Sequence, residues 1–195
     1  IGCINTSNRP VRLELHPKES SGLLAADYPR ELAPGQTAEI NLMYLNPEGA
    51  PRYGSLRDAL EVRADGRGNG TLIVAPGIGI DKSPADARRT PKVQITENII
   101  KFGPVKHNAP QQQRTFTLTN TGDGELIVRA VETGGKVATT LTPGQRIPAG
   151  SSFTAKATLD PGRQEYGVVT DFVTIITNDL TRPMRRLRAT AIVED

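Results

Sequence analysis

Apolar residues recur at every second position in several short stretches of the chain. In residues 60–65 apolar side chains alternate with charged ones, and residues 38–44 and 114–120 show the same period. A period of two places successive side chains on opposite faces of a β-strand, so that one face is buried and the other is exposed. No stretch longer than one turn carries the 3.6-residue period of a capped helix. The pattern therefore predicts an all-β protein.

Turn-forming residues separate these predicted strands at short intervals. The chain has 19 glycines and 15 prolines among its 195 residues. Strands that follow one another about every 8–12 residues, with Gly and Pro between them, are typical of β-sandwiches. The length suffices for two small domains, each with its own hydrophobic core.

A short phrase with an Asn-Thr turn between two strand-like runs occurs twice, about half a chain length apart. It is followed in both halves by a Pro/Gly turn and then by a Tyr-Gly pair with an aspartate four residues later. The matching blocks are 3–13 with 118–128, 32–42 with 147–157, and 52–62 with 165–175. Three blocks in the same order indicate that one sandwich module is present two times in tandem.

The predicted seam between the two modules is residues 81–92, which read DKSPADARRTPK. Two prolines, several charges and no periodicity are typical of a short, partly stiff linker. We therefore predict a first domain at residues 1–83, a linker at 84–91 and a second domain at 92–195.

The two predicted modules differ at their beginnings. The second has a strand-like stretch, Val93–Asn108, before its Asn-Thr phrase, whereas the first has only residues 1–4 there. We expect the first domain to lack its first strand or strands, either because the chain is a fragment of a longer protein or because residues from another source complete this edge. An open strand edge readily pairs with another chain.

Charge and cysteine content exclude several classes of protein. The net charge of +3 comes from 24 basic and 21 acidic residues that are dispersed along the chain, without the basic stripe of a nucleic-acid-binding protein. Leu187 lies between Arg186 and Arg188, which is the pattern of a strand with one solvated face. A single cysteine allows no intrachain disulfide, and no apolar run is long enough to insert into a membrane.

The second half of the chain resembles a family of bacterial immunoglobulin-like (Ig-like) domains of unknown function that is common in Bacteroidetes envelope proteins. The stretches that carry the resemblance are IKFGPV (100–105), FTLTNTGDGELIV (116–128), IPAG (147–150), YGVVTDFVTIITND (166–179) and RLRATAIV (186–193). The chain is also similar to the wider group of ASH, hydin and major-sperm-protein-like sandwiches. The resemblance implies two tandem Ig-like β-sandwich domains and a scaffolding or adaptor role. It also implies export to the periplasm or cell surface, with the signal sequence outside the residues given.

One motif of the resembled family is missing. Many of its members carry Cys-Gly-Cys in the strand after the Asn-Thr-Gly phrase, but the corresponding residues 131–140 contain no cysteine. A redox or metal role linked to that motif is therefore not expected here.

The sequence shows no arrangement of residues that would support catalysis or bind a cofactor or metal. The two histidines, His16 and His107, have no cysteine or histidine at ligand spacing and are expected at the surface. The Gly-rich residues 66–71 lack the lysine of a phosphate-binding loop, and we interpret them as a hairpin tip. Asp58 and Asp171 occupy matching places in the two halves, which favours a structural role as acceptors for turn amides.

Cys3 has two interpretations. The sequence Ile-Gly-Cys is similar to the end of a lipoprotein signal, in which case Cys3 would carry a lipid anchor. Ile1 and Cys3 also match Phe116 and Leu118, which are predicted to lie on the inward face of a strand. We favour a buried Cys3, because a free cysteine behaves as a small hydrophobic residue.

We expect a non-enzymatic module that acts as a scaffold, spacer or protein-binding adaptor. Its partner would be an envelope protein or a glycan, and strand addition at a sheet edge is one expected mode of binding. The predicted partner-contact face consists of exposed threonines and arginines on two strands, namely Arg114, Thr115, Thr117, Thr119, Arg186 and Arg188.

The alternative function is that of a carbohydrate-binding or accessory module of a larger glycan-handling protein. Aromatic residues make up only 4% of the chain, which argues against an aromatic sugar platform. Two of the four tyrosines lying exposed on one face would favour this alternative. Because Tyr53 and Tyr166 match between the two halves, we expect them in the cores or beside a turn instead.

Overall fold

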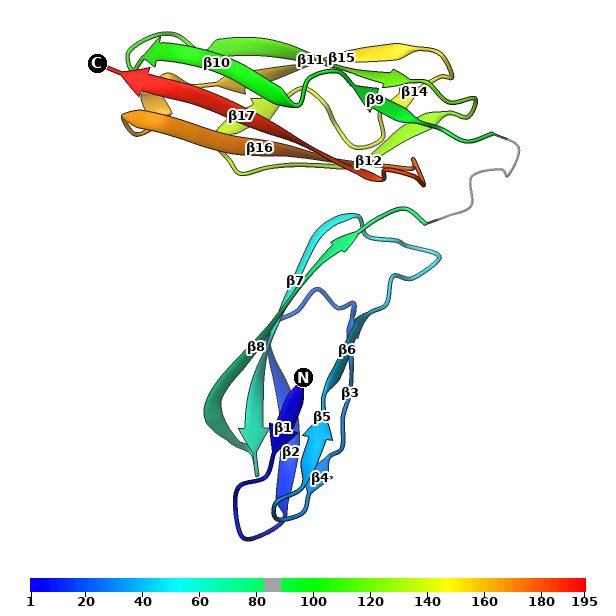
Figure 1. Cartoon of the computed structure of the whole chain (residues 1–195), viewed down its shortest axis with the longest axis vertical. Coiled ribbons are helices and arrows are strands. Elements are labelled where there is room, and N and C mark those ends of the chain that lie inside the picture. Colours follow the sequence, from blue (N-terminus) through cyan, green and yellow to red (C-terminus); the bar gives the residue numbers. More distant parts are fainter. Residues whose placement is uncertain (83–88) are drawn as a thin grey trace. The chain divides into compact units, whose positions relative to one another are not determined.

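The computed structural model describes residues 1–82 and 89–195, and these residues form β-strands that are joined by turns and one short 3-10 helix (Figure 1). The prediction of an all-β protein is therefore confirmed. The chain separates into two compact units, Ile1–Gly79 and Ile80–Asp195. They are called unit 1 and unit 2 below, and each is described by itself.

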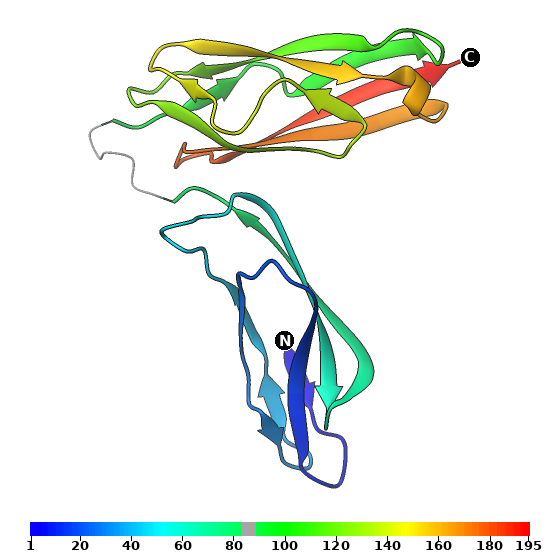
Figure 2. The same ribbon diagram turned by 180° about the vertical axis from the view of Figure 1, so that it is seen from behind.

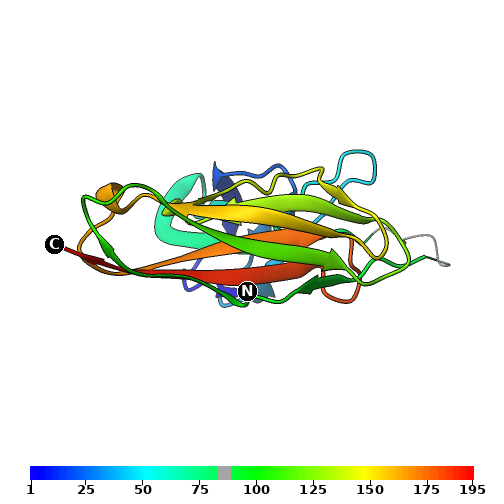
Figure 3. The same ribbon diagram turned by 90° about the horizontal axis from the view of Figure 1, so that it is seen from above.

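Unit 2 is an Ig-like sandwich of two sheets, which Figure 3 shows as two layers. One sheet has the strand order β10-β17-β16-β12-β14 and the other has the order β13-β15-β11-β9. β10 pairs with β17 in parallel, and the other pairs are antiparallel. The elements are β9 (Val93–Ile95), β10 (Ile99–Lys106), β11 (Gln112–Asn120), β12 (Leu126–Thr133), β13 (Val137–Thr139), β14 (Arg146–Ile147), β15 (Ser152–Leu159), η1 (Pro161–Arg163), β16 (Gly167–Thr177) and β17 (Met184–Glu194).

Unit 1 contains one four-stranded sheet, β4-β2-β7-β8, and two shorter strand pairs, β1-β5 and β3-β6 (Figure 2). Its strands are β1 (Gly2–Ile4), β2 (Val11–Glu19), β3 (Leu24–Asp27), β4 (Glu31–Leu32), β5 (Thr37–Glu39), β6 (Asn41–Tyr44), β7 (Gly54–Ala64) and β8 (Arg67–Gly79). β8 is the last strand of its sheet, and none of the described residues pairs with its outer edge.

The two units differ in the size of their cores. In unit 2 a cluster of 22 buried apolar residues fills the space between the sheets, and Phe116 and Leu118 at its centre are fully buried. In unit 1 the corresponding cluster has six members, Leu13, Leu32, Ile40, Leu60, Val62 and Ile73. Because apolar burial is the main force that stabilises a fold, unit 2 has the stronger basis for independent stability.

The alternation of apolar and polar residues is confirmed where it was predicted. Leu60 and Val62 are buried, whereas Glu61 and Arg63 between them are partly exposed. In residues 38–44 the even-numbered side chains face the core and Glu39, Asn41 and Met43 are exposed. These strands fold as predicted because each has one apolar face, which is buried in the core, and one polar face, which is solvated.

The prediction that residues 66–71 form a hairpin tip is wrong by a few residues. The turn consists of Asp65 and Gly66, which both have positive φ angles, of 51° and 75°. An Asp-Gly pair in this conformation is the tight turn that matches the twist of an antiparallel hairpin. Residues 67–71 lie in β8, so the strand begins earlier than its glycines suggest.

A buried asparagine organises the matching turn in each unit. Asn120 Nδ2 donates to the carbonyl oxygens of Gly124 and Ile147 at 2.7 and 3.0 Å, and its Oδ1 accepts from the Gly122 amide at 3.1 Å. Its amide therefore joins three separate pieces of backbone at one point.

Asn5 makes the same set of hydrogen bonds in unit 1. Its Nδ2 donates to the carbonyl oxygens of Arg9 and Leu32 at 2.8 and 2.9 Å, and its Oδ1 accepts from the Ser7 amide at 2.9 Å. The partners of Asn5 occupy the positions that match those of Asn120 in the sequence.

The predicted linker, residues 84–91, lies largely outside the described residues, and the predicted domain limits stay predictions. Its last residues, Arg89 to Pro91, lie against the turn after β11. The Thr90 amide donates to Asp123 Oδ1 at 2.6 Å, and a side chain on Gly122 would meet the Thr90 carbonyl oxygen at 2.2 Å. This part of the predicted linker is packed on unit 2.

Cys3 lies in β1 and packs against the apolar cluster of unit 1. Its side chain is half-buried, and its Sγ lies 3.5 Å from the Ala38 carbonyl oxygen. Its position on the inward face agrees with the interpretation of Cys3 as a core residue.

We predict that Asn120→Ala strongly destabilises unit 2. The alanine leaves two carbonyl groups and the Gly122 amide without their partner inside the protein, at a cost of about 2–4 kcal/mol. Urea unfolding of the variant measures this loss as a shift of the midpoint. Asn108→Ala, at an exposed position, is the control. A loss below about 0.5 kcal/mol for Asn120→Ala would contradict the structural role.

Candidate functional site

Asp58 and Asp171 are buried and hold turns together, as predicted. Asp171 accepts hydrogen bonds from the backbone amides of Gly134, Lys136 and Val137 at 2.8–2.9 Å. Asp58 accepts from both the amide and the hydroxyl of Ser21. In both units the aspartate thus anchors the loop that follows the neighbouring strand, which is β2 beside β7 in unit 1 and β12 beside β16 in unit 2.

Asp179 has a similar role that the sequence pattern did not indicate. It accepts hydrogen bonds from the Val93 amide, from the amide and hydroxyl of Thr181 and from the Arg182 amide, at 2.7–3.1 Å. Burial acts to raise the pKa of Asp179, but these donors outweigh it and hold the pKa below its ordinary value. The carboxylate joins the start of β9 to the loop between β16 and β17.

Asp58 is shifted in the same direction. Burial acts to raise its pKa, and the hydrogen bonds from Ser21 and Tyr44 lower it further than burial raises it. A lowered pKa keeps both aspartates ionised at neutral pH. They are therefore structural acceptors and not proton donors for a reaction.

The described residues contain no group of three His, Cys, Asp or Glu side chains that could hold a metal ion. Every buried side-chain nitrogen and oxygen in this part of the chain has a hydrogen-bond partner within the protein. No buried polar group is left to point at a substrate or cofactor. Among the described positions, no buried side chain is therefore marked as a catalytic candidate by an unsatisfied polar atom.

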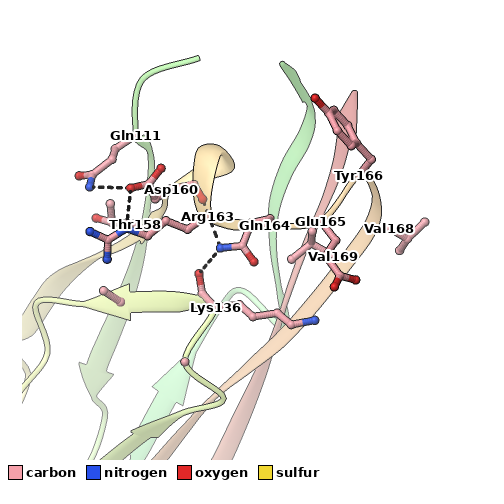
Figure 4. Close-up of a pocket in the computed structure, with 12 residues that line it drawn as sticks. Gln111, Lys136, Thr158, Asp160, Arg163, Gln164, Glu165, Tyr166, Val168 and Val169 are labelled. Carbon is pink, nitrogen blue, oxygen red and sulfur yellow. Dashed lines mark hydrogen bonds and ion pairs between the residues drawn. The ribbon is translucent and has the colours of Figure 1, made fainter. Parts of the chain in front are cut away.

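A pocket of about 560 Å³ lies at one end of unit 2, beside the 3-10 helix η1 (Figure 4). Its polar lining comes mainly from η1 and the residues that flank it. Asp160 Oδ2 lies 3.4 Å from Arg163 Nε, and Gln164 Nε2 donates to the Asp160 carbonyl oxygen at 3.2 Å. The side chains that line the polar part are Gln111, Lys136, Thr158, Asp160, Arg163, Gln164 and Glu165. The lining carries charges of both signs, so it has no strong preference for an anion or a cation.

Tyr166 and Val168 form the other side of this pocket. Tyr166 is 62% exposed, and its ring lies against the ring of His107, with centroids 4.7 Å apart. Of the two places expected for Tyr166, the core or a position beside a turn, the structure shows the second, because its ring packs beside the turn after β10. Tyr53 is half-buried. Tyr166 is the one tyrosine in the exposed class within the described residues, so the predicted condition for a sugar platform, two exposed tyrosines on one face, is not met.

Three apolar side chains lie side by side on the outside of the five-stranded sheet, next to the pocket. Val168 on β16 is directly opposite Ile192 on β17, and Ile192 is in turn opposite Pro104 on β10. Val168 is 76% exposed and Ile192 is 44% exposed. We call Pro104, Val168 and Ile192 the outer patch. An apolar row across three strands is unusual on a solvated sheet face.

The predicted partner-contact face is divided between the two sheets. Arg186 and Arg188 lie on β17 in the same outer face as the outer patch, and the Arg186 guanidinium lies 3.7 Å from the centre of the Phe172 ring. The threonines Thr115, Thr117 and Thr119 lie on β11, in the other sheet. The two arginines and the three threonines therefore lie on two different surfaces. Partner binding by either surface stays a prediction.

Arg114 departs from the predicted face. Its guanidinium donates to the carbonyl oxygens of Lys101 and Phe102 at 3.0 and 2.9 Å and lies over the Phe102 ring. Arg114 therefore ties β11 to β10 across the open side of the sandwich. Thr117 and Thr119 make cross-strand contacts to Thr154 and Ser152, which are the hydroxyl pairs expected on an exposed antiparallel face.

Sequence reasoning did not find the outer patch. Residues 166–173 contain apolar side chains at both alternate sets of positions, so the period of two does not show that Val168 points outward while Val169 is buried. The repeated Tyr-Gly phrase was the available signal, because it marks the start of β16. The pairing of Val168 with Ile192 depends on a register that only the structure shows.

Comparison with known proteins places the chain in a family. Residues 93–193, just over half of the chain, match the family model described as Protein of unknown function (DUF1573). The chain belongs to this family. The match covers the strands of unit 2 from β9 to the end of β17, including the pocket and the outer patch. The resemblance to an Ig-like family of unknown function is thereby confirmed.

Solved structures share the fold. The chain is similar to a crystal structure of a protein of unknown function from Porphyromonas gingivalis W83, with 18% identity and a TM-score of 0.64, over 97% of this chain and 87% of that one. It is also similar to the ASH/PapD-like domain 7 of human CEP192, with 14% identity and a TM-score of 0.46 over 60% of this chain and 94% of that one. At 18% identity the first likeness describes the fold alone.

No curated protein matches the chain. Among the residues that the structure describes there is no helix with the length and apolar character needed to cross a membrane.

We predict that Asp179 makes the stability of unit 2 depend on pH below its ordinary pKa of 3.8. Because the folded-state pKa is lowered, its stabilising effect is fully present above pH 3.8 and is lost as the pH falls through the folded-state value. In Asp179→Asn the side-chain NH2 group, which is a donor, faces backbone N–H donors. We expect the free energy of unfolding to fall by about 1–3 kcal/mol at neutral pH.

Urea unfolding of the two proteins at pH 7 and at about pH 2.5 measures this effect. We expect a large difference in unfolding free energy at pH 7 that becomes clearly smaller at the lower pH. Glu165→Gln, at an exposed carboxylate, is the control and should change neither value. A difference that is the same at both pH values would exclude the proposed linkage.

Proposed function

We propose that the chain is a non-enzymatic tandem Ig-like module of an exported bacterial protein, which binds another envelope protein as a scaffold, spacer or adaptor. The matching hydrogen bonds of Asn5 and Asn120 support the view that both units are copies of one module. The resemblance to envelope proteins supports export to the periplasm or cell surface.

The outer patch is the observation that carries this proposal. Pro104, Val168 and Ile192 expose a continuous apolar row on strands that the sandwich already holds rigid, so binding there orders little additional backbone. Arg186 and Arg188 lie farther along β17 on the same face. An apolar centre with arginines at its margin is the composition that protein-binding surfaces favour.

The absence of candidate catalytic groups among the described residues is consistent with a binding module. The buried carboxylates of Asp171 and Asp179 accept hydrogen bonds from backbone amides, and the end pocket has no histidine, serine or cysteine in its lining. A hydrolase would need a nucleophile or an activated water within reach of a base.

We predict that charge in the outer patch abolishes partner binding. In the double variant Val168→Glu, Ile192→Glu, two carboxylates replace the apolar contact, and we expect partner recovery to fall about tenfold or more. The measurement is crosslinking and affinity capture from the native cell envelope, with proteins and glycans quantified together. Wild type should recover one protein partner in near-equal amount.

The matched control is Ser152→Glu, Thr154→Glu, at two exposed positions of β15 in the other sheet. This control has the same charge change and should retain most of the binding. Equal recovery by wild type and the patch variant would show that the outer patch is not the contact surface. Recovery of no protein partner at all would contradict the protein-binding function.

A second candidate function is carbohydrate binding at the end pocket. It is favoured by one exposed ring, Tyr166, which lines the same pocket as the amides of Gln111 and Gln164 and the carboxylate of Glu165 (Figure 4). An aromatic face beside amide and carboxylate groups can stack on and hydrogen-bond to a sugar ring.

If this candidate is correct, calorimetry with envelope glycans should show binding that Tyr166→Ala removes, while Tyr53→Phe leaves it unchanged. Glycan recovered without a protein partner in the capture experiment would also favour it. No glycan binding by wild type would eliminate it.

A further inference from the structure

Three cations share the outer face of the five-stranded sheet with the outer patch. Arg186 and Arg188 are two residues apart on β17, and Lys101 on β10 is opposite Thr190, the next outward position of β17. The side chains of all three cations are exposed. Along β17 the outward positions therefore change from two arginines to a threonine and then to Ile192 in the outer patch.

These cations have no anionic partner within the described part of the chain. None of the ion pairs between described residues includes Lys101, Arg186 or Arg188. Like charges held on one face repel each other, and an anion that binds beside them relieves this repulsion. The basic part of the outer face is therefore complementary to a negatively charged ligand.

The acidic side chains Glu132 and Glu194 lie on the same face but away from the two arginines. Glu132 is on β12 and is separated from Arg186 by Thr174 on β16. Glu194 is opposite Lys106, beyond the outer patch near the end of β17. The middle of the face thus keeps its positive charge.

Phe172 holds one of the cations in place. The Arg186 guanidinium lies 3.7 Å from the centre of the Phe172 ring, and Phe172 is directly opposite Arg188. A guanidinium that stacks on a ring keeps its N–H groups at the edge, where they can donate two parallel hydrogen bonds to a carboxylate. Binding a carboxylate there costs less side-chain entropy than binding it with a freely moving arginine.

We propose that the outer face binds an acidic, extended segment of a partner protein. The segment lies along β17, with carboxylates at Arg186 and Arg188 and an apolar side chain in the outer patch at Ile192. Alternate residues of an extended chain face the same side about 7 Å apart, which is also the spacing of the two arginines on their strand. The segment therefore has acidic residues at its first and third positions and an apolar residue at its seventh. This inference names the partner chemistry of the binding function proposed above and rests on that function.

Residues 1–195 do not supply such a segment. Asp123 and Glu125 are their one pair of acidic residues two positions apart, and the apolar position that should follow is occupied by Arg129. Both carboxylates are also in use, since Asp123 accepts from the Thr90 amide and Glu125 pairs with Arg146. A second copy of these residues therefore does not fit as the occupant.

A lipid surface fits the outer face less well than an acidic protein segment. Peripheral contacts with a bilayer use large apolar side chains such as Trp, Phe and Leu beside basic residues. The outer patch instead consists of Pro104, Val168 and Ile192, which have short side chains. The Phe172 ring on this face is covered by the Arg186 guanidinium.

The test titrates the isotope-labelled full chain with short peptides and follows its backbone amide signals by NMR. The probe is Glu-Ser-Glu-Ser-Thr-Ser-Leu with acetyl and amide ends, together with its reverse, because both chain directions present the same side chains to β17. One control peptide has glutamine for both glutamates, and the other has serine for leucine.

We expect the probe, in its better direction, to bind with a dissociation constant on the order of 0.5 mM. The signals of Arg186, Arg188 and Ile192 should shift, and each control peptide should bind about fivefold more weakly. Affinity should fall about threefold or more between about 50 and 500 mM salt, because salt screens exposed charges. Shifts that do not saturate, or equal binding of the glutamine peptide, would overturn the proposal.

Arg186→Gln, Arg188→Gln is the matching change in the protein. Binding of the probe should weaken about fivefold and lose most of its salt dependence. The control is Lys136→Gln, Lys156→Gln, which removes two exposed cations outside this face and should bind the probe as wild type does. An equal loss in the control would show unspecific attraction and contradict the proposal. If the arginine variant unfolds, the glutamine peptide still decides, because it leaves the protein unchanged.

The capture experiment separates this inference from the function on which it rests. We expect the double arginine variant to recover about fivefold less partner than wild type. If Val168→Glu, Ile192→Glu loses the partner and Arg186→Gln, Arg188→Gln keeps it, the outer patch is a binding surface and the acidic partner is excluded. Recovery of no protein partner contradicts the binding function itself.

Two further measurements test the other occupants. Sedimentation with vesicles of three parts neutral and one part anionic phospholipid should leave the chain in solution. Binding to these vesicles that the double arginine variant loses would identify a lipid surface and overturn the proposal. Analytical ultracentrifugation should show no dimer that depends on the two arginines, and such a dimer would identify a second copy as the occupant instead.

Discussion

Each unit depends on a buried asparagine that satisfies backbone groups where strands end and loops meet. A loop that crosses a sandwich end leaves amide and carbonyl groups outside the strand ladders, and such groups are costly when water cannot reach them. Asn120 and Asn5 each provide donors and an acceptor at one such point. Asp171 and Asp58 provide acceptors alone, at the loops that follow β12 and β2. Buried asparagine and aspartate side chains are the residues that a sequence search would examine as candidate catalytic groups. In this protein they bind backbone groups of loops and thereby stabilise the fold.

The sheets of the two units differ in how well their edge strands are covered by other residues. In unit 2, β9 and β10 cover both sheets and Arg114 ties β10 to β11, so the core is sealed. In unit 1, β8 has no neighbour on its outer side and the buried cluster is small. A sheet edge exposes unpaired backbone groups together with the rim of the core, which are the two things that an added strand satisfies.

The proposed binding surface follows from the fold. The outer patch is apolar where a solvated sheet face is normally polar, and it lies on strands that the core of unit 2 already holds in place. It depends on no reactive group and uses geometry that a β-sandwich provides without additional elements.

The sequence alone was sufficient for the strands, their buried faces and the matching turns. A period of two identifies a strand because the pleat alternates side chains, and an Asn-Thr or Asp-Gly turn carries its own conformational preference. These are local properties, which explains why Leu60, Val62, Phe116 and Leu118 were placed correctly.

Only the tertiary structure decided which strands share a sheet and which side chains meet. The sequence analysis assigned Thr117 and Arg188 to one predicted partner-contact face. Long-range pairing puts their strands, β11 and β17, in opposite layers. Val168 meets Ile192 only through the register of β16 on β17, and Asp179 meets the Val93 amide only because β9 returns to that end of the sandwich. Pairing between distant strands depends on hydrogen bonds and packing that no local pattern encodes.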